Sequence, residues 1–489
     1  MPLISDQNQR ITSCFAEQLE RLDLKHIFDT AVADANHIDF LSLTFSIPSI
    51  DALAVLEQYN DKDAFNYYWE HPEKEFAMVA GGSLYRIQVR GPERFREASK
   101  RGKELVRRIA HSSSVNHRLA TVHLLGGFSF LDENTSPQWE PYGSGSFTLP
   151  EWHIVQDGNL TLLTINMPFH SELSFSDISE QFYSSIERLE QLCNAKSYAF
   201  ESVPLENASP ISFGENESEY ARWIHMIDNA RELIHHHAFD KIVLANERVI
   251  ELTHSISPTL ILNRLRNQYP NCYSFLIRHD DTSSFIGCTP ERLASFSHHF
   301  VFTEGLAGST SRGASASEDA VLEHQLLHSE KDLREHAFVI DAIEKNLSEF
   351  SEIIEHPVQP SVKKLSNVQH LFTPIRARIE EGASRTALLQ NLHPTPAVGG
   401  HPKEKAVPFI TELESFDRGW YAAPLGWINA HGEGEFVVAI RSGLIGEKEV
   451  RFFAGCGIVE DSDSRKEWEE MNLKLRPMLS ALHYAANHD

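Results

Sequence analysis

The sequence predicts an α+β fold, in which strands and helices do not alternate regularly. Segments with strand-like patterns outnumber the helical ones, and the few expected helices are long. No regular strand–helix–strand repeat occurs along the 489 residues. These observations favour α+β over a doubly wound parallel sheet.

Residues 1–200 are expected to form a mixed α/β region that is integrated with the core. Apolar and polar residues alternate at Phe76–Arg90 and at Leu160–Phe169, which predicts strands. A helix with polar faces is expected near Ser176–Asn194. Residues 201–218 are rich in Pro, Ser and Asn, and we interpret them as a connection.

The catalytic region is expected at residues 219–489. Helical spacing predicts helices at Glu219–His236, at Ala316–Ile353 (one helix or two nearly continuous ones) and at Arg465–Asn487. Strands are expected at Lys241–Leu252, Tyr273–His279, Ser283–Thr289, Leu293–Thr303, Gly426–Ile445 and Val450–Val459. Ser464 and Glu467 have the spacing of a capping box, which predicts the start of the last helix.

Charge and composition disfavour several classes of protein. The net charge of −25 argues against nucleic acid and anionic membranes as partners, because phosphate groups bind basic surfaces. The five cysteines include no CxxC pair, so neither a disulfide framework nor a zinc site is expected. No long apolar run and no targeting segment is found, so a cytoplasmic location is expected. A small anionic substrate is compatible with this charge if its site has local cations.

Common signature motifs are absent from the chain. It contains no GxGxxG after a strand, no GxxxxGK[ST], no HExxH and no GxSxG. Three consecutive histidines, at positions 235–237, do not indicate a metal site, because consecutive helical residues point in different directions. We expect them at a solvated helix end.

Seven segments in a fixed order carry the functional signal. They are DKIVLANE (240–247), TPERL (289–293), GLAGSTSRG (305–313), EKDLREH (330–336), HPTPAVGG (393–400), AIRSGLI (439–445) and AGCGIVEDSDSRKEWEEMNLK (454–474). In order and spacing, the chain resembles the chorismate-utilising enzymes, which include isochorismate, salicylate, anthranilate and aminodeoxychorismate synthases. The resemblance implies two stacked antiparallel sheets flanked by helices, with the active site between the sheets.

The resemblance also implies two catalytic residues. Lys241 matches the general base that takes a proton from water, although alone it would be an ordinary lysine at a strand end. Glu291 matches the general acid that protonates the departing C4 hydroxyl of chorismate. Hydroxide is a poor leaving group, so a proton donor is required. This role needs a raised pKa at Glu291, because the carboxyl must hold its proton near neutral pH.

Magnesium is the cofactor that the resemblance implies. Glu335 and Glu470, both on expected helices, match its ligands, and Mg²⁺ prefers a few carboxylates together with water and substrate oxygens. The ion would bind the ring carboxylate of chorismate. Asp332 and Glu467 are candidates of second rank, and the expected capping box gives Glu467 a competing structural role.

Further residues match substrate contacts of the family. They are Gly308, Ser309, Thr310, His393, Arg441, Gly455, Gly457 and Lys474. Arg441 lies in an otherwise apolar strand and fits a bidentate clamp on the enolpyruvyl carboxylate. A plain turn at 308–310 and a structural role for His393 stay open as alternatives.

Two positions favour isochorismate synthase within the family. Lys241 disfavours anthranilate synthase, which usually has a neutral amide there, and Ala307 disfavours aminodeoxychorismate synthase, which commonly has a lysine. Water is therefore expected to attack C2 of chorismate, and no glutaminase subunit is expected. The segments Phe65–Gly82 and Gly126–Trp152 are similar to the longer isochorismate synthases of menaquinone pathways.

Two alternatives remain. A salicylate synthase would share the lysine base and then eliminate pyruvate; only HPTPAVGG argues against it. A catalytically silent homologue that acts as a binding subunit is disfavoured because Lys241, Glu291, Glu335 and Glu470 are all present.

Overall fold

The computed structural model describes most of the chain. The described residues are 22–34, 36–59, 64–133, 135–194, 217–364, 368–380 and 382–487, together with Phe15 and Leu19. Of the expected connection, residues 201–216 lie outside this part, and Glu217 and Ser218 begin a helix.

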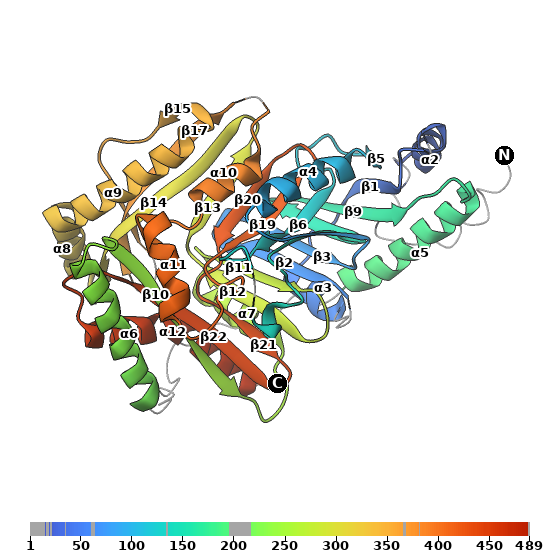
Figure 1. Cartoon of the computed structure of the whole chain (residues 1–489). Helices are drawn as coiled ribbons and strands as arrows, with labels where there is room; N and C mark the ends of the chain where they lie inside the picture. Colours follow the sequence, from blue (N-terminus) through green and yellow to red (C-terminus); the bar gives the residue numbers. More distant parts are fainter. Residues whose placement is uncertain are drawn as a thin grey trace.

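Two large sheets form the centre of the molecule, with helices around them (Figure 1). The 12-stranded sheet has the order β18 (Gly400–His401), β10 (Lys241–Glu251), β22 (Glu449–Ile458), β21 (Ser442–Gly446), β12 (Ser283–Thr289), β11 (Tyr273–Arg278), β2 (Asn66–His71), β3 (Phe76–Gly81), β8 (Trp152–Asp157), β9 (Leu160–Pro168), β1 (Phe40–Ile47), β5 (Ile109–Ser113). The 10-stranded sheet has the order β15 (Ser351–Glu355), β17 (Val368–Ile379), β14 (Phe300–Ser311), β13 (Arg292–Ser297), β20 (Gly434–Val438), β19 (Pro424–Asn429), β6 (His123–Phe128), β7 (Gly145–Leu149), β4 (Tyr85–Val89), and β16 (Ser361–Lys364) pairs with β17. Apart from the parallel pair β1–β5, the described pairings are antiparallel, which confirms the expected fold class.

Strands from residues 1–200 continue both sheets. In the 12-stranded sheet β2 pairs with β11, so that Tyr68 lies opposite Leu276. In the 10-stranded sheet β6 pairs with β19, so that Leu125 lies opposite Trp427. The N-terminal region therefore shares its hydrogen-bonded sheets with the region that was expected to be catalytic.

The helices pack around the sheets. They are α2 (Leu24–Ala33), α3 (Ala52–Tyr59), α4 (Arg94–Val106), α5 (Phe175–Cys193), α6 (Glu217–His235), α7 (Pro258–Gln268), α8 (Ala316–Leu327), α9 (Glu330–Leu347), α10 (Arg385–Leu392), α11 (Lys403–Leu413) and α12 (Ser464–Ala486). The segment expected as one or two helices is two, α8 and α9. They are separated where Ser329 caps α9 by accepting a hydrogen bond from the backbone N–H of Asp332. The three consecutive histidines are exposed at the end of α6, as expected.

The capping-box prediction for the last helix is wrong. Ser464 is the first helical residue of α12, and Asp463 is the N-cap. The Asp463 carboxylate accepts from the backbone N–H groups of Arg465 and Lys466 at 3.1 and 3.0 Å. A carboxylate at this place also interacts favourably with the helix dipole. Glu467 therefore has no capping role.

Two expected strands are each divided by a turn. Phe76–Arg90 forms β3 and β4, which belong to different sheets. Gly82 follows β3 with a φ of 72°, a conformation that favours glycine. Residues 293–303 fall in the hairpin of β13 and β14. No helix in the described ranges is long and apolar enough to cross a membrane.

An aromatic cluster fixes one side of the site described below. Trp139, Tyr142 and Trp420 are fully buried, and the Trp139 and Tyr142 rings make an edge contact at 5.5 Å between centroids. The Trp420 indole N–H donates to the carbonyl of Gly143 at 2.8 Å. Because Trp420 is anchored in this way, the neighbouring residues Arg418 and Tyr421 are held in place.

Candidate active site

A cavity of about 180 Å³ lies where the two sheets meet. Val243 of β10 and Gly455 of β22 line it from the 12-stranded sheet. Leu306, Lys363 and His370, from β14, β16 and β17, line it from the 10-stranded sheet. The cavity is therefore in the place where the sequence leads us to expect the active site.

Cations outnumber acidic residues in the lining of this cavity. Lys363, Arg418, Arg441 and Lys474 contribute to it, and Glu291 is the acidic residue among the lining residues. In a chain with a net charge of −25, such a concentration of positive charge is local. A cavity of this kind favours an anionic ligand.

Three of these four cations already have carboxylate partners. Lys363 pairs with Glu304 at 2.9 Å, Arg418 with Glu414 at 2.5 Å and Lys474 with Glu470 at 2.7 Å. The Lys474 ammonium also donates to the carbonyl of Gly455 at 3.0 Å. These pairs hold the cations at the wall of the cavity but reduce their net charge.

Arg441 differs from the other three cations. Burial lowers its pKa, and the side chains that act most strongly on its charge are Cys272, Tyr269, Tyr421 and Cys288, none of them a carboxylate. Its backbone has a φ of 51°, in the left-handed region that is uncommon for residues other than glycine. Its carbonyl accepts from the backbone N–H of Cys288 at 3.0 Å, which fixes this unusual turn. A guanidinium held in this way fits the expected clamp on a carboxylate.

Glu291 is held by its backbone between two strands. Its N–H donates to the Thr289 hydroxyl at 3.2 Å, and its carbonyl accepts from the N–H of Val438 at 3.0 Å. The Thr289 hydroxyl in turn donates to the carbonyl of Val438 at 2.7 Å. The Thr395 hydroxyl donates to Oε1 of Glu291 at 3.5 Å. The carboxyl is thus directed into the cavity by contacts on both sides.

Burial raises the pKa of Glu291 to about 7, and the negative charge of Glu304 adds to this effect. The hydrogen bond from Thr395 and the charges of Lys363 and Lys474 act in the opposite direction. A carboxyl with this pKa carries its proton in a substantial part of the molecules at neutral pH. It can therefore donate a proton, which is the chemistry that a general acid needs.

We expect Thr395→Val to shift the pH dependence of activity upward. The hydroxyl of Thr395 stabilises the charged form of Glu291, so its removal raises the pKa of the carboxyl further. Activity that needs the protonated acid falls as pH rises through this pKa. The alkaline limb of kcat/KM should therefore move to higher pH by about half a unit, and Thr395→Ser should restore it.

Glu304→Gln should have the opposite effect on the same limb. It removes the negative charge that raises the pKa of Glu291 and leaves the positive charge of its partner Lys363 in place. The limb should move to lower pH. Shifts of the same sign in both variants would contradict this account of the pKa.

Lys241 lies beside the cavity. It begins β10, two residues before the lining residue Val243, so both project from the same face of the strand. Its side chain lies on Gly457 of β22, where a Cβ would come within 2.7 Å of Lys241 Cε. Glycine at 457 therefore makes room for this lysine. The Lys241 ammonium pairs with Oε1 of Glu335 on α9 at 3.2 Å.

The expected magnesium ligands each pair with a lysine at or beside the cavity. Glu335 pairs with Lys241, and Glu470 pairs with Lys474. Among the described residues, no group of three or more His, Cys, Asp or Glu side chains could hold a metal ion. Mg²⁺ can use one or two carboxylates with water and substrate oxygens, so the donor chemistry of Glu335 and Glu470 fits this ion.

The candidates of second rank have other contacts. Burial raises the pKa of Glu467, and the Ser462 side chain bonds to its carboxyl. Asp332 packs on Gly308 of β14, where a Cβ would lie 3.0 Å from the Cβ of Asp332.

The other expected substrate contacts differ in how close they lie to the cavity. Gly308, with a φ of 73°, lies at an irregularity of β14, and the neighbouring Ser309 hydroxyl is 2.6 Å from Nδ1 of the lining residue His370. Thr310 follows in the same strand. His393 is buried against the ring of Phe130 and is not among the residues that line the cavity. Its position favours the structural alternative for this histidine.

The sequence did not single out several residues of the site. Lys363, His370, Arg418 and Tyr421 line the cavity but had no expected role. Thr395, which bonds to Glu291, lies within the segment HPTPAVGG but was not named. The strand β17 pairs with the distant strand β14, and β16 pairs with β17, so the place of both at the cavity depends on a long-range pairing that local patterns do not reveal.

A protein-family match and two similar proteins agree on the family of this chain. Residues 25–483 match the family described as "Chorismate binding enzyme". The chain is 35% identical over 456 residues to isochorismate synthase MenF of Bacillus subtilis, covering 92% of this chain and 94% of that protein. It is 34% identical over 464 residues to a salicylate biosynthesis isochorismate synthase of Pseudomonas aeruginosa, covering 94% of both.

The fold is also similar to a solved structure. The menaquinone-specific isochorismate synthase MenF from Escherichia coli matches with a TM-score of 0.72 at 22% identity, over 93% of this chain and 100% of that chain. The family match and the two relatives each extend over more than nine-tenths of the 489 residues. The chain therefore belongs to the chorismate-binding enzyme family.

Proposed function

We propose that this chain is an isochorismate synthase, which isomerises chorismate to isochorismate. The observation that carries the proposal is a cavity that is lined both by Arg441 and by a carboxyl, Glu291, with a pKa of about 7. Both relatives described above are named as isochorismate synthases, at 35% and 34% identity. Their pathways differ by name, one being a MenF protein and the other belonging to salicylate biosynthesis, whereas the reaction is common to both.

In the proposed reaction, Lys241 is the general base and Glu291 the general acid. Lys241 takes a proton from water as the water oxygen bonds to C2 of chorismate. The ring double bonds shift, and the C4–O bond breaks as Glu291 gives its proton to the departing hydroxyl. One water molecule enters and one leaves, so atoms balance, and the proton gained by Lys241 must return to Glu291 before the next turnover. Such proton transfers typically contribute 10²–10⁴-fold each.

The cations of the cavity bind the two carboxylates of chorismate in this proposal. Arg441 clamps the enolpyruvyl carboxylate, since the side chains that act most strongly on its charge are thiols and phenols and not carboxylates. In the same proposal, Lys474 and the backbone at Gly455 and Gly457 contact the ring side of the substrate. The ion pairs at Lys363, Arg418 and Lys474 orient these cations before substrate arrives, which reduces the reorganisation needed during the reaction.

Glu335 and Glu470 would hold Mg²⁺. When bound, the ion supplies positive charge that orients and stabilises the ring carboxylate of the substrate. Each carboxylate also pairs with a lysine, so it links the ion to the residues around the cavity.

Glu470→Ala is expected to raise the Mg²⁺ concentration for half-maximal activity by about tenfold or more. The variant loses one oxygen ligand, while Lys474 keeps its hydrogen bond to Gly455. Glu469→Ala is the matched control, because Glu469 is an exposed neighbour on the same helix that pairs only with Arg465 in the described residues. Titration of activity with MgCl₂ measures the effect, and equal magnesium dependence of the two variants would exclude Glu470 as a ligand.

The product profile tests the proposed function. Purified protein with chorismate and Mg²⁺ should give isochorismate, with little pyruvate, both with and without ammonium, as read by proton NMR. Stoichiometric pyruvate with salicylate would instead support salicylate synthase. An aminated product would contradict the role of Lys241, and absence of turnover would support a silent homologue.

A further inference from the structure

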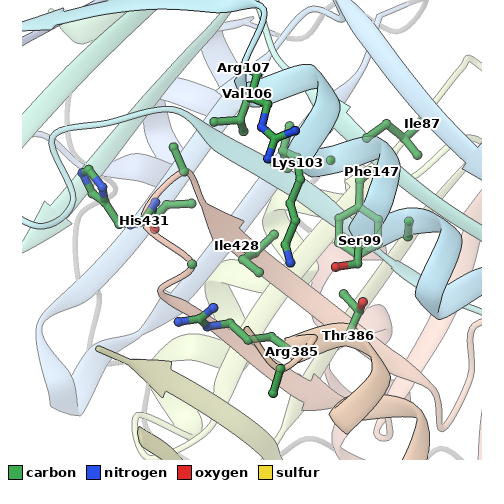
Figure 2. A pocket seen from close by; sticks show the side chains of 17 residues that line it. Ile87, Ser99, Lys103, Val106, Arg107, Phe147, Arg385, Thr386, Ile428 and His431 are labelled. Carbon is green, nitrogen blue, oxygen red and sulfur yellow. Dashed lines mark hydrogen bonds between the residues drawn. The ribbon is translucent and has the colours of Figure 1, made fainter. Parts of the chain in front are cut away.

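A second cavity, of about 310 Å³, lies outside the active site. It is formed by α4, the turn that connects β19 and β20, and the start of α10 (Figure 2). None of its lining residues belongs to the lining of the active-site cavity. Chorismate binding by the family therefore does not account for it.

Small residues on α4 create the space. The buried face of this helix carries Ala98 and Gly102, and both line the cavity. A glycine inside a helix is unfavourable relative to alanine. A Cβ at Gly102 would meet a single atom, Cδ1 of Leu124 at 3.4 Å, so close packing does not demand glycine there. The missing side chain instead enlarges a cavity whose apolar surface includes Ile428 and Phe147.

Basic side chains border this apolar surface. Lys103, Arg107, Arg385 and His431 line the cavity, and no Asp or Glu is among the lining residues. Figure 2 shows Lys103 from α4 and Arg385 from α10 on opposite sides of the cavity, and Ile428 also lines it. Within the described residues, neither of these two side chains forms an ion pair with a carboxylate.

Arg385 carries an unused donor at this place. Its Nη2 donates to the carbonyl of His298 at 3.0 Å, but its buried Nε has no hydrogen-bond partner in the structure. Its guanidinium lies on Gly432, where a Cβ would come within 2.6 Å of Cζ. Glu433, whose charge acts on Arg385, is already bonded to Arg118 at 3.0 Å. Glu433 therefore forms no ion pair with the Arg385 guanidinium, and an anion bound in the cavity would be attracted to this charge.

We propose that this cavity is a binding site for a small, largely apolar carboxylate with an aromatic or alicyclic body. The body lies on Ala98, Gly102 and Ile428, and the carboxylate lies between Lys103 and Arg385. The volume is at the lower end of the range for small-molecule sites, so a nucleotide or a long peptide does not fit this description. The apolar surface also disfavours a bare inorganic anion.

The two elements that border the cavity also hold the general acid. α10 begins at Arg385 in the cavity and ends at Leu392, three residues before Thr395, which bonds to Glu291. β20 follows the turn at Gly432 and ends at Val438, whose N–H binds the carbonyl of Glu291. Occupancy of the cavity should therefore change kcat/KM for chorismate, in addition to giving a binding signal.

Binding of 2-naphthoate, measured by calorimetry on the full chain, tests the proposed site. Lys103→Gln and Arg385→Gln should each weaken binding by about tenfold or more, and Gly102→Leu should abolish it by filling the cavity. Lys100→Gln is the matched control, because Lys100 is an exposed lysine of α4 outside the lining. Thermal unfolding of each variant shows whether it is folded.

Two comparisons separate this site from the active site. Arg441→Gln should leave binding of 2-naphthoate unchanged, whereas loss of binding in Arg441→Gln alone would assign the ligand to the active-site cavity and overturn the proposal. Neutral 2-naphthalenemethanol should bind at least tenfold more weakly than 2-naphthoate, and equal binding would overturn the role of the cations.

Absence of any binding by 2-naphthoate or benzoate at millimolar concentration would overturn the site itself. Binding without a change of kcat/KM would overturn its connection to Glu291.

Discussion

Lys241→Gln is expected to lower kcat for chorismate by about 10²–10⁴-fold. The amide keeps the length of the side chain but cannot accept a proton from water. The fold should be unaffected, because the ion pair between Lys241 and Glu335 is partly exposed and such pairs contribute at most about 1 kcal/mol. Steady-state kinetics and thermal unfolding of the same preparations give both readouts.

Two further variants distinguish a role of Lys241 in proton transfer from a role of its positive charge. Lys241→Arg keeps a positive charge opposite Glu335, but a guanidinium does not release its proton in proteins. It should therefore be about as inactive as Lys241→Gln. Lys448→Gln changes an exposed lysine in the turn before β22 and should retain full activity. An active Lys241→Arg variant would show that Lys241 acts through its charge on Glu335 and not as a base.

Local sequence patterns predicted a helix or strand of this chain well where the pattern corresponds to a single, uninterrupted element. The strand Ser283–Thr289 and the helices α5 and α6 lie within two residues of the expected positions. The patterns failed where a glycine or a turn divides an apolar run, as at Gly82 between β3 and β4. The start of α12 was misplaced by one residue, because Asp463 and Ser464 are both good caps and a sequence pattern does not show which side chain reaches the free N–H groups.

The site was predictable in so far as its residues lie in recognisable segments. Glu291, Arg441, Gly455 and Lys474 all line the cavity. The pKa of Glu291 was expected to be raised, but its causes were not visible, since Glu304 and Thr395 approach it from other strands and loops. Lys363 and His370 were not predicted as site residues for the same reason. The second cavity depends on small residues of α4 facing a distant turn, and its formation requires the three-dimensional fold.

Glu291→Gln is expected to lower kcat by about 10²–10⁴-fold, because glutamine has nearly the same shape but cannot transfer a proton to the departing hydroxyl. The contacts of its backbone with Thr289 and Val438 are independent of the side chain, so the loop should keep its position. Glu447→Gln is the matched control, since Glu447 is an exposed glutamate in the turn between β21 and β22. Activity retained by Glu291→Gln would remove Glu291 from the role of general acid.

The same substitution has a second, independent consequence for stability. The pKa of Glu291 is about 7 in the folded protein and about 4.5 in an unfolded chain, so between these values the folded state binds more protons than the unfolded state. The free energy of unfolding therefore falls as pH rises from about 4.5 to about 7 because of this group. Glu291→Gln removes this dependence, so its melting temperature relative to the unaltered protein should be higher at pH 8 than at pH 5. A variant that loses activity without this change in relative stability would show that the carboxyl is not held in a raised-pKa environment, and the proton donor for the C4 hydroxyl would have to be sought elsewhere.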